Sequence, residues 1–345
     1  MKRLKVVFLF TPGPIGGAEK IILHGLEALR DEIQDLELWI LKEEKVFEVT
    51  HQFLKLVERV GVNYRVYTLN SAVDLNILRE LREDFREHCP DIVHTHGMKA
   101  AVYGKLTANS SAKFVISHHA ASTSSFKDKF YESIEKIILK KADAVITPSD
   151  GLKEELVRAH IPTEKLFVVE NLLTAKIRQY INRSLPRLRL VYAGKLSAKK
   201  KISDLIEAIQ RTNAELLLIG EGEERPFLEK KVEELKLNHR VKFLGFKKDV
   251  SPYLTHTHAL VLMPTEKETP PTFVEASCMG IPVIKIQEED GCDSILEKIR
   301  DFEERQDTLI EEAQRKKSDF IDRFSPKKWA QNILDIYVTT LSVEK

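Results

Sequence analysis

The chain has 345 residues, of which 43% are hydrophobic and 31% charged, and its formal net charge is +1. That length predicts two domains, and the balanced charge gives no reason to expect nucleic acid as a partner. Cys89, Cys278 and Cys292 show no paired or metal-ligand spacing, so we expect reduced thiols in a cytosolic protein. The first apolar run, 6–10, is too short for a signal peptide or a membrane span.

The first half of the chain alternates short apolar runs with helical patterns. Apolar runs of this length, without alternating polar residues, are typical of strands buried on both faces of a sheet. We expect strands at 4–10, 36–41, 64–67, 91–96, 113–119, 142–149 and 166–171, and helices at 18–29, 46–60, 73–88 and 150–159. The alternation predicts a mostly parallel, doubly wound sheet.

Several of these strands end in residues that can carry chemistry. The loop after the first strand contains Gly16 and Gly17, which would let a ligand approach the backbone closely, although the sequence is not a dinucleotide-binding fingerprint. Four histidines lie at strand ends or just beyond them: His94, His96, His118 and His119. No carboxylate or cysteine joins them at a metal-ligand spacing. We therefore expect one or two histidines to line a cleft and the others to be structural.

A second series of strands and helices follows a region without clear periodicity, 171–187, which we interpret as a linker. We expect strands at 188–193, 216–219, 240–244, 259–263 and 282–286, and helices at 202–210, 229–237, 250–254 and 271–279. Lys195 and the lysine run 199–201 lie between the first strand and helix of this series. Such lysines either clamp an anionic ligand or form a solvated basic turn.

The stretch 259–286 has the pattern strand, loop, helix, strand. Pro271 suits the first position of a helix and Gly280 its end. The loop and the helix N-terminus are then expected at the carboxyl edge of a parallel sheet, where such sheets bind ligands and where an anion is favoured. Glu268 and Glu275 flank that helix end, and a carboxylate can accept hydrogen bonds from two neighbouring sugar hydroxyls. The simpler alternative is a βαβ unit with two solvated acids.

Together these motifs resemble one family, the retaining glycosyltransferases of family 4, which have the GT-B fold. The resemblance covers nearly the whole chain and depends on the order of the motifs GGAE (16–19), DIVHTHG (91–97), SHH (117–119), ADAVITPS (142–149), VVEN (168–171), YAGKLSAKK (192–200), LLLIGEGEE (216–224), RVKFLGF (240–246), PTEKETPPTFVEASCMGIPVI (264–284) and FSPKKWAQNILDIY (324–337). It implies two Rossmann-like, doubly wound α/β domains that face a cleft. The expected domains are 1–170 on the acceptor side and 188–326 for the nucleotide-sugar donor, with the last helix, 327–345, packed back on the first domain.

The resemblance also implies roles for individual residues. Lys195 and Lys200 match two cations at the donor pyrophosphate, where they would stabilise the charge that develops on the leaving group. Lys195 stands where the family has an arginine, so the charge is kept and the bidentate fork is lost. The other donor contacts that the resemblance implies are Gly16, Gly17, Gly220, Phe246, Glu268 and Glu275, with Glu275 at the ribose. The residues implied nearest the transferred sugar and the acceptor are His119, with His118 as its alternative, His96 and Glu19.

Three features depart from the family pattern. The first glutamate of the family's Glu-x7-Glu motif falls on Lys267, and a one-residue shift of the loop would bring Glu268 to the donor sugar instead. Ala120 replaces a glycine after the histidine. The segment after Ile286 is shorter than in the family, so we expect part of the donor site to be missing or rebuilt there.

The function that the resemblance implies is retaining, metal-independent hexosyl transfer, without a further cofactor. The donor would be a nucleotide sugar, by family habit a UDP-sugar, and the acceptor a glycan, a lipid-linked sugar or a protein. The alternative is a non-catalytic GT-B protein that binds or assists another transferase. We expect the protein in the cytoplasm. Its basic amphipathic segment 126–141 would suit peripheral contact with the inner face of an anionic membrane, although a core helix with a solvated basic face is the simpler interpretation.

Overall fold

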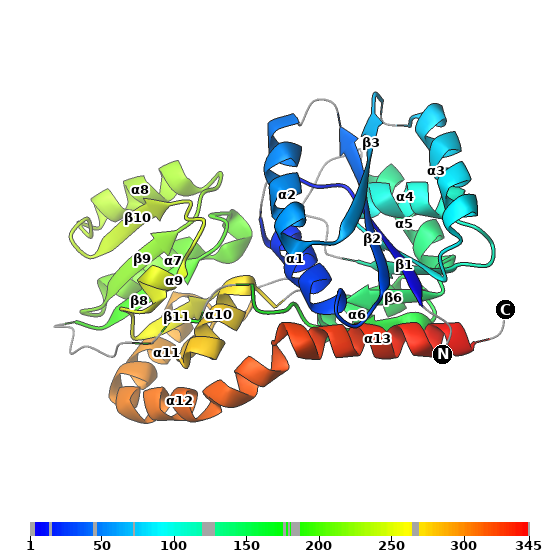
Figure 1. The fold of residues 1–345 in the computed structure, drawn as a ribbon. Helices are drawn as coiled ribbons and strands as arrows, with labels where there is room; N and C mark the ends of the chain where they lie inside the picture. The colour runs from blue at the N-terminus through cyan, green and yellow to red at the C-terminus, as the bar shows by residue number, and fades with distance from the viewer. Residues whose placement is uncertain are drawn as a thin grey trace. The chain divides into compact units, whose positions relative to one another are not determined.

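The computed structural model describes residues 4–13, 16–43, 47–71, 73–118, 128–174, 177–178, 180, 187–263 and 269–343, apart from the side chains of 47–50 and 128–133. The chain divides into two compact units. Unit 1 is Met1–Leu172 together with Ser325–Lys345, and unit 2 is Leu173–Phe324. Each unit has one parallel sheet whose strands alternate with helices along the chain (Figure 1), so the expected α/β class is confirmed.

Within the described residues, the sheet of unit 1 has seven strands in the order β3-β2-β1-β4-β5-β6-β7. The elements of unit 1 are β1 (Lys5–Phe10), α1 (Gly17–Leu29), β2 (Asp35–Glu43), α2 (Phe47–Val60), β3 (Asn63–Leu69), α3 (Leu75–His88), β4 (Ile92–His96), α4 (Met98–Thr107), β5 (Lys113–Ser117), α5 (Asp128–Lys140), β6 (Ala144–Thr147), α6 (Asp150–Arg158), the 3-10 turn η2 (Thr163–Lys165), β7 (Leu166–Val168) and α13 (Pro326–Ser342). The register aligns the ends of β1, β4 and β5, because Phe10 pairs with His96 and His96 with Ser117.

The central strands of unit 1, β1, β4, β5 and β6, are buried on both faces, whereas the edge strand β3 is largely exposed. In β1, Val6 and Phe8 belong to a core with α1, α2 and α13, whereas Val7 and Leu9 belong to a core with α3, α4, α5 and α6. Successive side chains of a strand point to opposite faces. A strand covered on both sides is therefore apolar at every position, which is how β1 could be predicted from the sequence.

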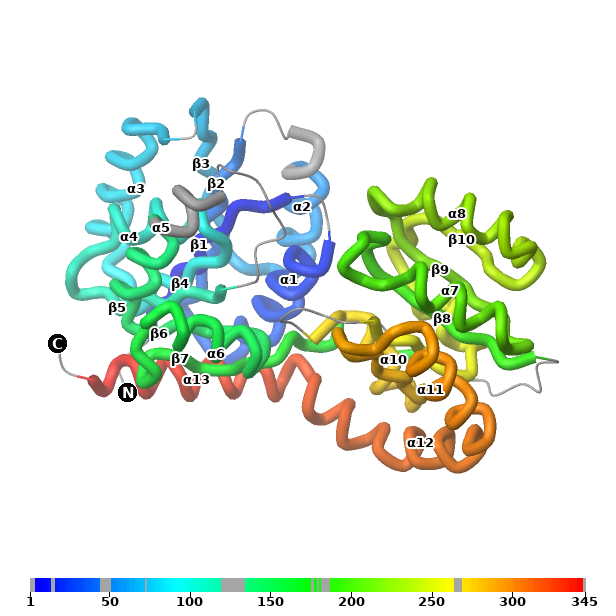
Figure 2. The backbone as a smooth tube through the Cα atoms, turned by 180° about the vertical axis from the view of Figure 1, so that it is seen from behind, coloured from blue at the N-terminus to red at the C-terminus, as the bar shows by residue number. Residues whose placement is uncertain are grey.

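The last helix, α13, lies along unit 1 although it follows α12 of unit 2 in the chain (Figure 2). It packs on α1 so closely that a Cβ added at Gly25 would lie 2.7 Å from the Trp329 ring. At the end of unit 2, the main-chain N–H of Leu173 donates to the carbonyl oxygen of Phe324 at 2.7 Å. The two points at which the chain leaves unit 2 are thus hydrogen-bonded to each other.

Within the described residues, the sheet of unit 2 has five strands in the order β10-β9-β8-β11-β12. The elements of unit 2 are β8 (Arg189–Ala193), the 3-10 turn η3 (Ala198–Lys200), α7 (Ile202–Gln210), β9 (Glu215–Ile219), α8 (Arg225–Glu234), β10 (Val241–Gly245), α9 (Ser251–Leu254), β11 (Ala259–Leu262), α10 (Pro271–Met279), β12 (Val283–Lys285), α11 (Cys292–Glu304) and α12 (Gln306–Arg323). The loop 286–291 joins β12 directly to α11. The short segment expected after Ile286 therefore forms a plain loop.

Two helices differ from the expectation. The sequence pattern does not predict α4, which is buried on several sides and so lacks a polar face. The helix expected at 229–237 is wrong in its bounds, because α8 begins at Arg225 and ends at Glu234. Pro226 in its first turn suits a helix start, and the positive φ of Lys236, +57°, ends the helical conformation.

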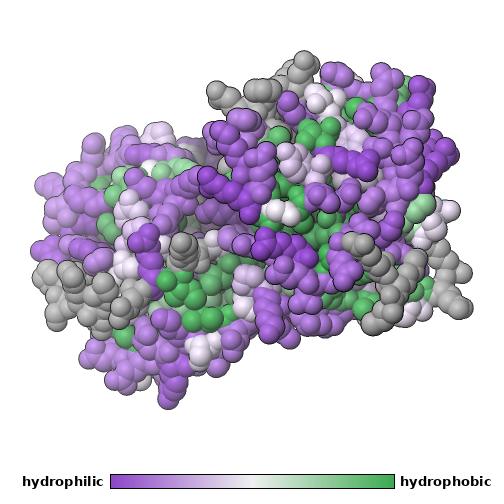
Figure 3. Space-filling view, viewed as in Figure 1, coloured by the Kyte–Doolittle hydropathy of each residue, from purple (hydrophilic) through white to green (hydrophobic). Residues whose placement is uncertain are grey.

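The exterior agrees with the highly charged composition. The face in Figure 3 is mainly hydrophilic, with smaller apolar patches. Among the described residues, no helix combines the length and the apolar character needed to cross a membrane. Cys89, Cys278 and Cys292 are free thiols.

Candidate functional site

Two loops cross at the carboxyl edge of the unit 2 sheet, and they touch backbone to backbone. After β8, the main-chain N–H of Gly194 donates to the carbonyl oxygen of Ile219 at 2.9 Å. A Cβ added at Gly220 would lie 1.9 Å from the carbonyl oxygen of Gly194, and one at Gly222 would lie 2.0 Å from that of Leu196. Gly220 also has φ +138°, a conformation that other residues rarely adopt. Both glycines are therefore required for this crossing.

Lys195 lies on the first of the crossing loops. Its carbonyl oxygen accepts a hydrogen bond of 2.8 Å from the hydroxyl of the buried Tyr192, which holds the main chain in place. Its side chain is 63% exposed, and its ammonium lies 3.1 Å from the carboxylate of Glu223 on the second loop. A hydrogen bond from its own main-chain N–H and the Lys195 ammonium lower the pKa of Glu223. Because exposed ion pairs are weak in water, a phosphate could take the place of Glu223 at Lys195.

The lysine run 199–201 does not act as one cluster. Lys200 ends η3, on the same connection as Lys195, and is half-buried. Lys201 has the left-handed φ of +48°. Its ammonium donates to the main-chain carbonyl oxygens of Glu288 and Asp290 in the loop 286–291. Lys201 therefore stabilises that short loop, and Lys195 and Lys200 remain as the candidate phosphate ligands.

Asp290 holds the loop 286–291 from within. Its buried carboxylate accepts hydrogen bonds from the main-chain N–H of Gln287 and the hydroxyl of Ser294, both at 2.6 Å, and from the ammonium of Lys298. Burial alone would raise the pKa of Asp290, but these hydrogen bonds outweigh it and hold the pKa at about 2. The carboxylate is thus ionised at neutral pH and fixes the rebuilt edge beside β12.

Phe246 stands at the end of β10 on the same edge of the sheet, and its side chain is 70% exposed. It follows Gly245, whose φ is +70° and whose carbonyl oxygen accepts a 3.0 Å hydrogen bond from the N–H of Gly220. The loops after β8, β9 and β10 are therefore connected through their backbones. An exposed ring at this position offers a flat face on which a nucleobase can stack.

The helix α10 begins at Pro271 and ends at Met279, and Gly280 caps its C-terminus, as predicted. Glu275 lies in its second turn and is half-buried. Burial and the nearby Glu275 carboxylate raise the pKa of Cys278 to about 11, so the thiol is protonated at neutral pH and unsuited to act as a nucleophile. Glu268 and Lys267 lie outside the described residues, so the prediction for Glu268 stays a prediction.

In unit 1, Glu19 organises the glycine loop from within. Its carboxylate is buried and accepts hydrogen bonds from the main-chain N–H groups of Gly13, at 2.9 Å, and Gly16, at 3.0 Å. Gly16 caps α1, and Gly17 is the exposed first residue of that helix. Glu19, an expected acceptor-side residue, therefore holds the shape of the loop, and Gly16 and Gly17 present the helix N-terminus.

The histidines at the strand ends differ in their surroundings. His96 is 3% exposed and lies against Phe8, with ring centroids 5.1 Å apart, and against His94, at 4.4 Å. His118 has a side chain 10% exposed, with Nδ1 3.2 Å from the carboxylate of Glu135 on α5. His119 lies outside the described residues. Small hollows adjoin both described candidates. The one at His96, of about 10 Å³, is also lined by Ile21, Ser117, Ile146, Thr147, Pro148, Val169, Asn171 and Trp329.

A group able to share a metal ion lies elsewhere in unit 1. Within the parts of the chain that the structure describes, Asp35, Glu37 and His88 have potential ligand atoms within 4.8 Å of one another. Asp35 and Glu37 are the first and third residues of β2, and His88 ends α3, so the group is at the amino edge of the sheet. The indole N–H of Trp39 already donates to Glu37 at 2.8 Å. This group has no connection with the strand-end histidines.

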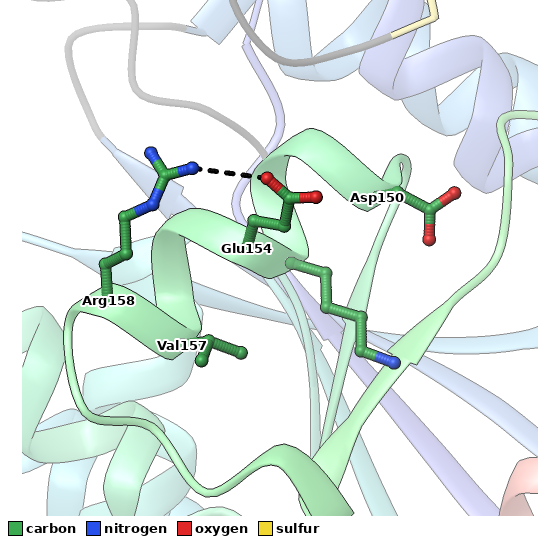
Figure 4. A pocket seen from close by; sticks show the side chains of 5 residues that line it. Asp150, Glu154, Val157 and Arg158 are labelled. Carbon is green, nitrogen blue, oxygen red and sulfur yellow. Dashed lines mark hydrogen bonds and ion pairs between the residues drawn. The ribbon is translucent and has the colours of Figure 1, made fainter.

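A wide, shallow hollow of about 500 Å³ lies over the exposed face of α6 (Figure 4). Its lining is Asp150, Lys153, Glu154, Val157 and Arg158. Glu154 and Arg158 face each other, with a nitrogen–oxygen distance of 3.2 Å. The two acidic and two basic side chains balance, so the hollow offers no excess charge to a ligand, and we do not include it in the site.

Sequence reasoning did not identify three residues that shape the edge of unit 2: Gly222, Glu223 and Tyr192. The two glycines of the segment 220–222 could have indicated a close backbone approach. The contacts of Glu223 and Tyr192 with the Lys195 loop depend on how the loops cross. No local sequence pattern predicts such contacts.

Comparisons with known proteins match both halves of the chain. The model of Glycosyltransferase Family 4 matches 15–173, and that of Glycosyl transferases group 1 matches 174–319. An uncharacterized glycosyltransferase of Methanocaldococcus jannaschii is 26% identical over 240 residues, which cover 61% of this chain and 59% of that protein. The N-acetyl-alpha-D-glucosaminyl L-malate synthase of Bacillus anthracis is 22% identical over 231 residues, covering 61% and 60%. The chain thus matches about three fifths of the length of these relatives.

Among solved structures, that of Anabaena HepE in complex with UDP is similar over 97% of this chain and 100% of its own, with a TM-score of 0.79 and 17% identity. The two family models meet between residues 173 and 174, one position from the boundary of the two units between Leu172 and Leu173. The sequence motifs, the two parallel sheets and both family models agree. The chain belongs to the family 4 glycosyltransferases and has the GT-B fold.

Proposed function

We propose that the chain is a retaining glycosyltransferase of the hexosyltransferase type, which uses a UDP-sugar as donor. The observation that carries the proposal is the edge of unit 2. The main chain of Lys195 is fixed by Tyr192 while its ammonium is exposed, Lys200 lies on the same connection, and Phe246 is exposed on a connected loop. This edge combines cations for a pyrophosphate with a flat apolar face for a base. The similarity to HepE, whose structure contains UDP, supports the choice of nucleotide.

The proposed chemistry is electrostatic. When the sugar is transferred, negative charge develops on the departing diphosphate, and Lys195 and Lys200 would stabilise it. Glu275 would accept hydrogen bonds from the ribose hydroxyls, and the N-terminus of α1 at Gly16 and Gly17 would favour the phosphates. Two ammonium groups can neutralise a diphosphate without a metal ion, so we propose that the reaction is metal-independent and needs no cofactor besides the donor.

We place His119 and Glu268 at the transferred sugar and His96 near the acceptor, on the family resemblance. The acceptor would be a hydroxyl of a glycan, a lipid-linked sugar or a protein. For a lipid-linked acceptor, we propose that the protein catalyses the transfer at the cytoplasmic face of the membrane. The helix α5 would contact it, because Ile137 is 54% exposed between the exposed Lys136 and Lys140.

A second candidate, a non-catalytic partner of another transferase, is favoured by one observation. The loop 286–291 joins β12 directly to α11, and the family resemblance implies a longer segment there that completes the donor site. A protein of this kind would bind UDP or a UDP-sugar and leave it intact.

The test is to mix the purified chain with a panel of UDP-sugars and a cell-envelope extract, and to measure UDP release and sugar transfer with and without EDTA. UDP binding would be measured by calorimetry for the wild type and for Lys195→Ala/Lys200→Ala. Each charge-assisted hydrogen bond is worth roughly 1.5–3 kcal/mol, so each lysine should account for about a ten- to a hundredfold change in affinity. Lys230→Ala, at an exposed lysine of α8 paired with Glu234, controls for the loss of a surface positive charge in unit 2.

Transfer that survives EDTA, with weaker UDP binding in the double variant alone, is the expected result. Binding of an intact UDP-sugar without turnover would select the non-catalytic partner. A wild-type chain that does not bind UDP, or turnover lost to EDTA and restored by magnesium or manganese, would contradict the proposal.

A further inference from the structure

A buried histidine joins the last helix to the end of a central strand in unit 1. His94 Nδ1 lies 2.6 Å from the hydroxyl oxygen of Tyr337 on α13, and His94 Nε2 lies 2.8 Å from the hydroxyl oxygen of Ser117 on β5. His94 and Tyr337 are fully buried, and Ser117 is 7% exposed. These three side chains form one hydrogen-bonded row, the Tyr337–His94–Ser117 chain, which joins the neighbouring strands β4 and β5 to the distant helix α13.

Both ring nitrogens of His94 have a hydrogen-bond partner in this row. A neutral imidazole has one donor nitrogen and one acceptor nitrogen, and each hydroxyl can donate or accept. Burial raises the pKa of Tyr337 well above its ordinary value, so its hydroxyl keeps its proton. Phe8 packs on His94, with ring centroids 4.7 Å apart. Away from water such hydrogen bonds are strong and directional, and a missing partner is costly.

The row meets the backbone where β5 ends. Ser117 is the last residue of β5 and pairs in the sheet with His96 of β4 and Ile146 of β6. The next main-chain N–H, that of His118, donates to the carbonyl oxygen of Ile146 at 2.8 Å. The row therefore acts on the point from which the chain departs towards His118 and His119.

We propose that Tyr337, His94 and Ser117 are positioning residues for the transfer reaction. The row fixes the carboxyl end of β5, and thereby the start of the segment that carries His119, the histidine proposed to lie at the transferred sugar. The inference rests on the proposed function for its catalytic consequence. The nucleotide contacts proposed for unit 2 do not involve the row, so it should affect the rate of the bound complex and leave nucleotide affinity unchanged.

The test compares Tyr337→Phe and Ser117→Ala, which each remove one hydroxyl, with their double variant and with Ser117→Thr, which keeps a hydroxyl. The matched control is Tyr103→Phe. Tyr103 is also buried in unit 1, and its hydroxyl oxygen accepts a 2.7 Å hydrogen bond from the main-chain N–H of Asp74, away from β5's end. A small misplacement of a reacting group can cost about a hundredfold in rate.

We expect Tyr337→Phe and Ser117→Ala to lower kcat by roughly ten- to a hundredfold and to leave the Kd of UDP unchanged. Because the hydroxyls belong to one row, the double variant should lose little more than either single one. Ser117→Thr should recover most of the rate. Tyr103→Phe should keep the wild-type kcat at temperatures at which it is folded.

A second measurement does not depend on turnover. Hydrogen exchange of the amides of 113–118 should become faster in Tyr337→Phe and stay unchanged in Tyr103→Phe. If the wild type shows no turnover, the proposed function fails and the catalytic consequence of the row fails with it, whereas the exchange result still decides whether the row fixes the end of β5. Wild-type kcat in Tyr337→Phe, or equal exchange in both tyrosine variants, would overturn the inference while leaving the proposed function standing.

Discussion

The main chains of Gly194 and Gly220 touch at the carboxyl edge of unit 2, since a Cβ added at Gly220 would lie 1.9 Å from the carbonyl oxygen of Gly194. The contact is between two backbones, so neither side can turn away as a flexible side chain would. It sets the height of the loop that carries Lys195 above the sheet. The affinity of this edge for an anion should therefore depend on Gly220 even if Gly220 never touches the ligand.

Gly220→Ala should destabilise unit 2 strongly. The substitution combines the backbone clash with an unfavourable φ of +138°, and such local strain costs about 1–3 kcal/mol even without a clash. Denaturant unfolding should show a loss of at least roughly 2 kcal/mol. The matched control is Gly291→Ala, since a Cβ at Gly291 meets nothing within 4 Å and its φ is negative. Equal unfolding midpoints for the two variants would contradict this account.

Glu223→Gln should strengthen UDP binding. Glu223 neutralises Lys195 in the free protein, at 3.1 Å, and its charge would repel a phosphate that takes its place. Because the pair is exposed and screened, the gain should be small, roughly two- to fivefold in Kd at low salt. Calorimetry at two salt concentrations would measure it.

Two controls make that measurement specific. Glu234→Gln removes a charge of the same sign from the far end of α8 and should change the affinity less. In a Lys195→Ala background, Glu223→Gln should lose most of its effect, because the two residues act on each other. An unchanged or weaker affinity in Glu223→Gln alone would separate Lys195 from the phosphate site.

The fold could be predicted wherever a local pattern determines an element. The strands β1 and β9 are continuous apolar runs because both of their faces are covered, and α10 lies between a proline and a glycine that mark its ends. The helix α4 could not be predicted in this way. Its Ala100, Ala101, Tyr103 and Gly104 are all buried, so no polar face gives it a helical period.

The candidate site could be predicted only in part, for a similar reason. Lys195 follows a strand and precedes a helix, which is a local pattern. The position of Glu223 beside it depends on the crossing of two loops. His94 and Tyr337 are 243 positions apart in the chain, and their contact exists only because α13 packs on unit 1. Tertiary contacts of this kind leave no periodic signal in a single sequence.

Asp290→Asn should remove an acid-sensitive part of the stability of unit 2. The folded pKa of Asp290, about 2, lies below the ordinary value of 3.8, so the ionised carboxylate stabilises the fold above pH 4. That contribution is lost as the pH falls towards 2. It should amount to roughly 1–2 kcal/mol, because the Lys298 partner is partly exposed to solvent. The difference between wild type and variant should therefore be present at pH 6 and vanish near pH 2.

Denaturant unfolding across this pH range would show the effect. Asp293→Asn is the control, since the side chain of Asp293 is 85% exposed in the first turn of α11, the helix that follows the loop. A stability difference between wild type and Asp290→Asn that stays constant from pH 6 to pH 2 would show that the carboxylate charge does not matter.

Glu275→Gln tests which part of the donor α10 recognises. A carboxylate accepts hydrogen bonds from two neighbouring ribose hydroxyls, whereas an amide has one acceptor oxygen and an NH₂ group that competes as a donor. We expect UDP affinity to fall by roughly ten- to a hundredfold, which corresponds to about 1.5–3 kcal/mol for a hydrogen bond to a charged group. Glu297→Gln, an exposed acid of α11, controls for the loss of one negative charge in unit 2.

The ligand can be varied in the same experiment. Wild-type protein should bind 2′-deoxy-UDP more weakly than UDP, because one hydroxyl of the pair is missing. Glu275→Gln should bind the two nucleotides almost equally. Cys278 reports on the integrity of α10, since its buried thiol should stay unreactive towards thiol reagents in a folded variant. If Glu275→Gln keeps the wild-type preference for UDP while Cys278 stays protected, then Glu275 does not contact the ribose. The carboxylate would then stabilise α10 itself, and another residue at the carboxyl edge of the unit 2 sheet would have to bind the ribose.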